Sequence, residues 1–305
     1  MEAGRRDPVR RCGHQCSHPG PAHRGQPSVA SLKNRDPLPG VNLIYQLSSR
    51  QNLRFGYSRT LSRPDFRELS PFEFTNVVGG YSTLGNPNLR RATIDNFDVR
   101  WEYFPGGSQI IAASYFFKDF TDPIETTIRA TADIRQTFLN AEGARNQGVE
   151  LEYRRSLGSV SPRLSQFSLG ANVTIVDSQV QIPKDEGVLL TSTSRPLVGQ
   201  SRYIFNIISE WARPQWHSSA RFYVNSVSRR ITDVGTFGLS DIYQERNTFL
   251  DFVYQYEIGE KGRWNIRFAA ENLADNRYHW TQGSLLQRDF RMGRNFNIGT
   301  SFSFF

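Results

Sequence analysis

Residues 167–175, with the sequence FSLGANVTI, alternate apolar and polar side chains along their whole length. Successive side chains of an extended chain point to opposite faces, so such a segment presents one apolar and one polar face. Its apolar face is formed by Phe167, Leu169, Ala171, Val173 and Ile175. This alternation predicts a β-strand that separates two different environments.

The same period recurs from residue 38 to the C-terminus, and it predicts about twelve strands. Many of them are ten or more residues long, whereas strands of soluble proteins average roughly 5 to 6 residues. Further clear examples are residues 41–47, 53–57, 97–103, 149–153, 250–256 and 264–268. The sequence therefore predicts an all-β fold for this part of the chain.

The connections between these strands alternate in length. Short turns are expected at residues 48–51, 104–108, 157–165, 212–215 and 258–262, and long loops at residues 60–92, 119–145, 178–199, 229–246 and 272–292. Short turns at one end and long loops at the other are typical of an antiparallel transmembrane β-barrel in a bacterial outer membrane. Strands of about ten residues are long enough to cross a bilayer when tilted.

The N-terminal 35 residues differ from the rest of the chain. The whole sequence has 37 basic and 29 acidic residues, and this segment holds seven of the former and two of the latter. It has no hydrophobic period, so we predict a disordered basic tail over residues 1–35, not native to the fold, and a barrel domain over residues 36–305. The balanced charge of the barrel domain argues against a nucleic-acid partner.

No pattern in the sequence indicates an enzyme or a bound cofactor. The chain lacks G-x-S-x-G, H-E-x-x-H and phosphate-loop motifs. Cys12, His14, Cys16 and His18 alternate within the tail, which is not the spacing of a structural zinc site. We therefore expect no catalytic residue, no cofactor and no functional metal site.

Four of the five tryptophans lie within a few residues of short turns. They are Trp101, Trp211, Trp216 and Trp264, and Trp280 alone lies in a long loop. Tryptophan is enriched where a membrane meets water. These four residues are predicted to form an aromatic girdle at one membrane interface, with outer-membrane lipid as a partner.

Several motifs resemble one family. RTLSRPDF at residues 59–66, GNPNL at 85–89, RPLVGQS at 195–201 and GVELEY at 148–153 are similar to segments of TonB-dependent outer-membrane receptors. The likeness covers about residues 38–305 and implies the C-terminal part of the receptor β-barrel. The resemblance also implies an outer-membrane location in a Gram-negative cell, although the sequence shows no signal peptide.

The last strand also follows the pattern of the family. Phe296, Ile298, Phe302 and Phe304 keep one phase, and Phe305 lies one residue beyond it. In the family, a terminal strand of this kind is the signal for the barrel-assembly machinery. The resemblance implies that role for these four residues.

The resemblance implies a receptor or transporter that imports a scarce ligand, either an iron chelate or an oligosaccharide, with energy from the TonB system. Intact relatives have a plug domain, a TonB box and about 22 strands. The sequence shows neither plug nor TonB box, so we expect a fragment without autonomous transport. The alternative is a complete small nonenzymatic barrel with a structural or adhesion role.

Ligand contacts are expected from the long loops, because binding residues often lie on loops that a rigid scaffold positions. The candidates are Arg63, Asp65, Phe66, Tyr278, Trp280 and Arg288. For Arg63 and Phe66, together with Pro64, the alternative is that they fix the path of the chain as it leaves the barrel.

Overall fold

The computed structural model describes residues 32–75, 82–107, 109–129, 135–183, 189–259 and 264–303. Cys12, His14, Cys16 and His18 lie outside these residues, as do almost all of the predicted tail and Phe304. The sequence predictions for those positions therefore remain predictions.

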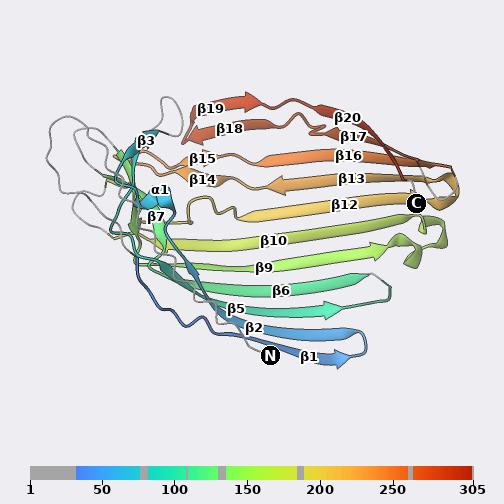
Figure 1. Cartoon of the computed structure of the whole chain (residues 1–305), viewed down its shortest axis with the longest axis horizontal. Coiled ribbons are helices and arrows are strands. Elements are labelled where there is room, and N and C mark those ends of the chain that lie inside the picture. The colour runs from blue at the N-terminus through green and yellow to red at the C-terminus, as the bar shows by residue number, and fades with distance from the viewer. Residues whose placement is uncertain are drawn as a thin grey trace.

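One large antiparallel sheet forms the body of the molecule (Figure 1). It has twelve strands, of which eleven follow each other in chain order and the short β11 (Ser194–Arg195) pairs with β10. The eleven are β1 (Gly40–Ser48), β2 (Gln51–Ser62), β5 (Ala92–Tyr103), β6 (Ile110–Thr121), β9 (Gly143–Ser156), β10 (Phe167–Gln181), β12 (Tyr203–Arg213), β13 (Ser218–Val227), β16 (Asn247–Ile258), β17 (Trp264–Glu271) and β20 (Asn295–Phe302). The predicted all-β, antiparallel fold is confirmed.

The alternation of short and long connections is also confirmed. The short turns lie together at one end of the sheet, called here the turn end, and the long loops lie at the other, the loop end (Figure 1). The turns contain the 3-10 helices η1 (Leu157–Ser159), η2 (Pro162–Leu164) and η3 (Pro214–Trp216). Adjacent antiparallel strands need only a few residues to connect them, so the short turns follow directly from the pairing.

The long loops contain secondary structure that the sequence analysis did not predict. A four-residue helix, α1 (Phe66–Leu69), and two four-stranded sheets form at the loop end. One sheet contains β3 (Glu73–Thr75), β4 (Ser82–Leu84), β8 (Arg135–Asn140) and β7 (Ile124–Arg129), and the other contains β14 (Arg230–Asp233), β15 (Ile242–Gln244), β18 (Arg277–Gln282) and β19 (Leu285–Arg291). These strands satisfy the backbone hydrogen-bonding groups of loops that fold back on each other.

The strand register places the two kinds of side chain on opposite faces of the main sheet. Asp98, Arg100 and Glu102 share one face with Arg54 of the neighbouring strand, and we call it the inner face. The other, outer face carries most of the exposed apolar side chains, including Ile298, which is 78% exposed. A sheet that exposes its apolar face is suited to lipid rather than to water.

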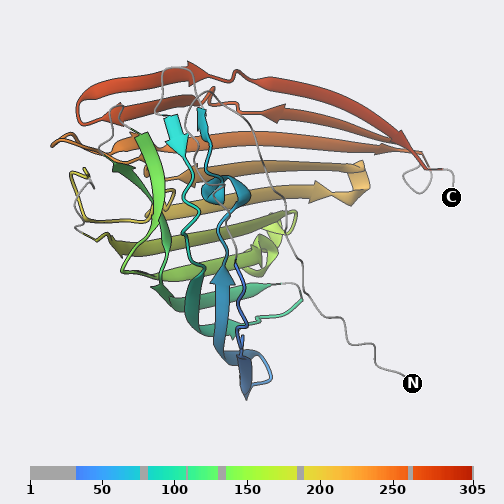
Figure 2. The ribbon, with the colours of Figure 1, turned by 60° about the vertical axis from the view of Figure 1, so that its left-hand side comes forward.

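The main sheet is strongly curved, and the described strands leave it open. In Figure 2 the N-terminal strands run steeply across the view, whereas the C-terminal strands run nearly horizontally. Among the described residues, β1 pairs only with β2, and β20 pairs only with β17. Among these residues no helix is long and apolar enough to span a membrane.

Candidate ligand-binding site

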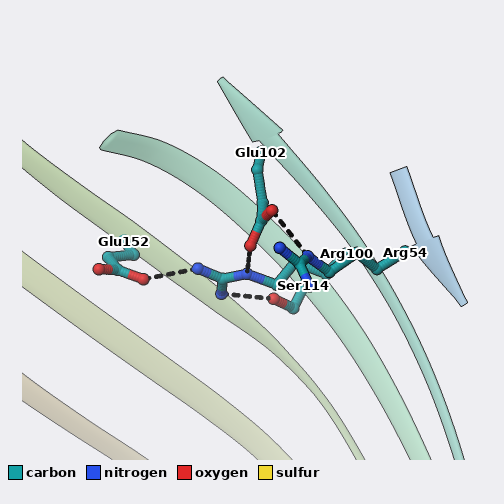
Figure 3. A network of polar contacts seen from close by, with 5 residues as sticks. All are labelled: Arg54, Arg100, Glu102, Ser114 and Glu152. Carbon is teal, nitrogen blue, oxygen red and sulfur yellow. Dashed lines mark hydrogen bonds and ion pairs between the residues drawn. The ribbon is translucent and has the colours of Figure 1, made fainter. Parts of the chain in front are cut away.

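A network of charged side chains lines the inner face (Figure 3). Arg100 lies at its centre: its Nε donates to Glu102 Oε1 at 2.9 Å, its Nη2 to Glu152 Oε2 at 2.6 Å and its Nη1 to Ser114 Oγ at 3.1 Å. Arg54 Nε donates to the other oxygen of Glu102 at 2.8 Å. The network therefore connects strands β2, β5, β6 and β9.

This network balances two arginines against two glutamates. The Glu102 side chain is almost completely covered, whereas the other three charged groups are partly exposed. Both oxygens of Glu102 accept from arginine, so this buried carboxylate is fully paired. The inner face thus presents an ordered, polar wall, as the alternation of the strands predicts.

A cluster of aromatic rings lies at the loop end, on the C-terminal strands. Tyr278 and Phe290 are direct cross-strand partners on β18 and β19, and their ring centroids lie 5.3 Å apart with planes 8° from parallel. Trp280 lies 5.7 Å from Phe290, and Phe249 of β16 lies 6.1 Å from Tyr278. Offset-stacked rings at these distances stabilise one another.

An arginine completes this cluster. Arg288 pairs with Trp280 across the hairpin, and its Cζ atom lies 5.0 Å from the centroid of the tryptophan ring. A cation over an aromatic face is attracted by the ring quadrupole. Three of the residues predicted as ligand contacts, Tyr278, Trp280 and Arg288, therefore lie together.

Phe249 fixes the direction in which the cluster faces. On β16, Phe249 and Asp251 lie on the same face of the sheet. Asp251 pairs with Tyr223 of β13, which lies on the inner face together with Arg221, the ion-pair partner of Glu210. Because Tyr278 contacts Phe249, the aromatic side of the hairpin faces the interior of the curved sheet. We call Phe249, Tyr278, Trp280, Phe290 and Arg288 the aromatic cluster.

The opposite side of the same hairpin is polar. Arg277 Nε donates to Asp289 Oδ1 at 2.7 Å, and this hydrogen bond lowers the pKa of the Asp289 carboxyl below its usual value. Arg291 Nη1 donates to Asp275 Oδ2 at 2.7 Å. Of these two pairs, only Arg277–Asp289 joins the two strands of the hairpin, and it supports the register that brings the aromatic rings together.

The other three candidate residues lie elsewhere. Asp65 caps α1: its side chain accepts from the Phe66 backbone, and Glu68 completes the capping box. Pro64 is buried, whereas Arg63 and Phe66 are exposed. No described contact joins these residues to the aromatic cluster, so the role of Asp65 in the structure is to begin the helix.

The residues expected at the membrane interface lie at the turn end. Trp101, Trp211 and Trp264 project from the outer face, and Trp216 ends the 3-10 helix between β12 and β13. Phe296, Ile298 and Phe302 also share the outer face of the last strand. Their roles in membrane contact and barrel assembly stay predictions.

Two members of the aromatic cluster, Phe249 and Phe290, were not predicted from the sequence. The sequence does contain a signal for Phe290, because a glycine at position 283 is typical of a hairpin turn, and in the structure its φ is +58°. The two strands that this turn connects place Phe290 opposite Tyr278. Phe249 could have been assigned to the inner face from its phase on the strand. Its contact with Tyr278 depends on the tertiary structure.

A second feature not predicted is a buried ion pair between two long loops. Arg195 Nη1 lies 2.8 Å from Glu125 Oε2, and both side chains are at most 5% exposed. Arg195 also donates to the backbone oxygens of Pro196 and Thr126. Burial raises the pKa of the Glu125 carboxyl, and the charge of Arg195 opposes that rise. The pair joins β7 to β11 and so holds the two loops together.

We expect Arg195→Met to release these loops, because it leaves the Glu125 carboxyl buried without its partner, at a cost of about 3 to 5 kcal/mol. Protonation of the Glu125 carboxyl removes its buried negative charge, so the loss of loop stability is smaller at pH 5 and larger at pH 8. Hydrogen exchange of residues 189–195, compared with that of β9, measures the effect. The double variant Glu125→Gln/Arg195→Met is the control: protection as low as that of the single variant would contradict this explanation.

The described residues contain no group of three or more potential metal ligands. The candidate ligand-binding site is the aromatic cluster at the loop end, and the charged network lies on other strands of the inner face.

Comparison with known proteins identifies the family. The family model for the TonB dependent receptor-like β-barrel matches residues 19–273. The chain belongs to this family. TonB-dependent receptors are a family of receptors and transporters rather than of enzymes.

The relatives of this TonB-dependent receptor barrel include an iron-regulated outer membrane virulence protein of Vibrio cholerae serotype O1. It is 22% identical over 275 residues, which cover 87% of this chain and 39% of the relative. The chain thus spans well under half the length of that curated relative.

Two solved structures show the same fold. The siderophore receptor PirA from Pseudomonas aeruginosa is 18% identical, with a TM-score of 0.58, over 88% of this chain and 42% of PirA. The ferric yersiniabactin uptake receptor FyuA from Yersinia pestis is also 18% identical, with a TM-score of 0.58, over 88% of this chain and 37% of FyuA.

Proposed function

We propose that this chain forms part of the wall of an outer-membrane receptor and contributes a binding surface for an anionic iron chelate. The observation that carries the proposal is the aromatic cluster, which faces the interior of the curved sheet at the loop end. Import across the membrane, driven by TonB, belongs to a receptor with a plug.

The chemistry of the cluster favours this ligand class. Flat rings such as those of Tyr278 and Trp280 stack on planar groups, and the guanidinium of Arg288 attracts a negative charge. A neutral oligosaccharide also stacks on aromatic rings, but it has no charge for Arg288 to attract. PirA is named as a siderophore receptor and FyuA as a ferric yersiniabactin uptake receptor, which agrees with an iron chelate.

The test is a titration of the full chain, refolded in detergent micelles, with ferric enterobactin, followed by quenching of tryptophan fluorescence. Trp280→Ala and Arg288→Gln are each expected to weaken binding about tenfold, because each removes a contact that we place at about 1.4 kcal/mol. A neutral maltodextrin serves as the oligosaccharide probe and should bind more weakly.

Arg291→Gln is the matched control, because it removes the same charge from the same strand on the polar side of the hairpin. An equal loss for Arg288→Gln and Arg291→Gln would show that the cluster does not contact the ligand. If neither probe binds, the structural or adhesion alternative is favoured. Tighter binding of the maltodextrin would reverse the choice of ligand class.

A further inference from the structure

The two ends of the outer face differ in their charges. At the loop end, arginines are paired: Arg59 Nη2 lies 2.8 Å from Asp95 Oδ2, and Arg145 Nε lies 3.3 Å from Asp119 Oδ1. At the turn end, Arg155 and Arg213 continue the outward phase of β9 and β12. Within the described part of the chain, neither forms an ion pair with an acidic side chain, in contrast to Arg59 and Arg145.

Aromatic rings hold Arg213 in place at the turn end. Its Cζ atom lies 3.4 Å from the centroid of the Trp216 ring, which in turn contacts Trp211 at 6.2 Å, edge to face. Trp211 is fixed by donating its Nε1 hydrogen to Gln166 Oε1 at 3.1 Å. The guanidinium of Arg213 therefore has a defined position at the rim of the sheet.

The side chains of Arg155 and Arg213 are partly exposed, although their Nε atoms are buried. A ligand can therefore reach only the exposed part of each side chain. Guanidinium groups are strong donors that match phosphate oxygens. An anion at this rim would neutralise positive charge that no acidic side chain of the described part of the chain neutralises.

Exposed apolar side chains lie in the turn that follows β9 and at the start of β10. Val160 is 68% exposed and Leu164 39% exposed in the turn between β9 and β10, and Phe167 begins the outer face of β10. Exposed apolar groups next to unpaired arginines match a molecule with both an anionic head and a hydrocarbon tail. Neither a soluble anion nor a neutral lipid has both parts.

We propose that the rim formed by Arg155, Arg213 and Trp216 binds the headgroups of anionic phospholipids, of the phosphatidylglycerol type. The arginines bind the phosphates, Trp216 lies at the headgroup level, and the acyl chains lie against the apolar outer face. This inference rests on the membrane placement in the proposed function, but not on its iron chelate.

The test measures quenching of tryptophan fluorescence by brominated phosphatidylglycerol and brominated phosphatidylcholine, with the full chain in detergent micelles at low salt. An arginine near an anionic lipid surface contributes about a fivefold increase in affinity. The wild type should therefore prefer phosphatidylglycerol about 25-fold through Arg155 and Arg213. Arg155→Gln/Arg213→Gln should lose this preference and keep its quenching by phosphatidylcholine.

Arg59→Gln/Arg145→Gln is the matched control, because it removes two arginines from the same face at the other end, and it should keep the preference. The proposal is overturned if phosphatidylglycerol does not quench the wild type more strongly than phosphatidylcholine. An equal loss in the control variant also overturns it. Quenching by neither lipid, in contrast, would contradict the membrane placement itself.

Discussion

Reconstituted into lipid vesicles, the full chain is expected to give no compact, heat-modifiable band of the kind that a closed barrel gives on a gel. Strands β1 and β20 form the two edges of the main sheet, and both run from the loop end to the turn end. Joining them would require a parallel pair, whereas barrels of this kind are antiparallel with an even number of strands. If the two edges stay open in lipid, each unpaired backbone group along them costs several kcal/mol.

The charged network adds a second obstacle to closure. Arg54, Arg100, Glu102 and Glu152 lie side by side on the inner face, and a barrel of eleven strands would be much narrower than one of about 22. A narrower barrel would crowd these groups and reduce the water around them. Self-closure is therefore disfavoured both at the edges and inside.

Disulfide trapping tests closure directly. With Cys12 and Cys16 replaced by serine, cysteines at Leu43 and Ile298 lie on the two edge strands and are not expected to crosslink within one molecule. Cysteines at Phe268 and Ile298, which are direct partners, should crosslink and serve as the positive control. A crosslinked monomer in the first variant, together with a heat-modifiable band and a discrete channel conductance, would establish a small closed barrel.

Replacing an outward side chain by arginine is expected to destabilise the sheet far more than replacing an inward one. Phe252 and Ile266 lie on the outer face, so an arginine at either position meets hydrocarbon. The cost is about 2 to 4 kcal/mol near the middle of a bilayer, and it is smaller at Ile266, which lies two residues from Trp264 at the turn end. Asn265 lies on the polar inner face, and Asn265→Arg should be tolerated. The denaturant midpoint in detergent micelles, followed by tryptophan fluorescence, measures the difference.

Neighbouring residues give the best control in this comparison. Ile266→Arg and Asn265→Arg introduce the same group at adjacent positions of one strand, so only the face differs. Asp251→Arg is less suitable, because Asp251 Oδ1 accepts a hydrogen bond from the backbone of Asn272, and its loss costs about 1 kcal/mol. Equal losses at 265 and 266 would show that the two faces are assigned wrongly.

The sequence by itself determined the fold class, the order of short turns and long loops, and the side of each strand on which a residue lies. These properties are local, because the period of a strand depends only on alternating side chains and a turn depends only on a few residues. That is why the inner position of Asp98, Arg100 and Glu102 was predictable, and why the tryptophans could be placed at one end.

The tertiary structure alone decided what depends on distant segments. The Glu125–Arg195 pair joins residues 70 positions apart, and the Phe249–Tyr278 contact joins a strand to a loop hairpin. Strands β1 and β20 run in the same direction because eleven described strands, an odd number, follow each other in the main sheet. The periodic pattern of the sequence predicts only about twelve strands, whereas the pairing of the strands gives the exact number. Such contacts form only when the strands pair and curve, because neither partner carries a local signal for the other.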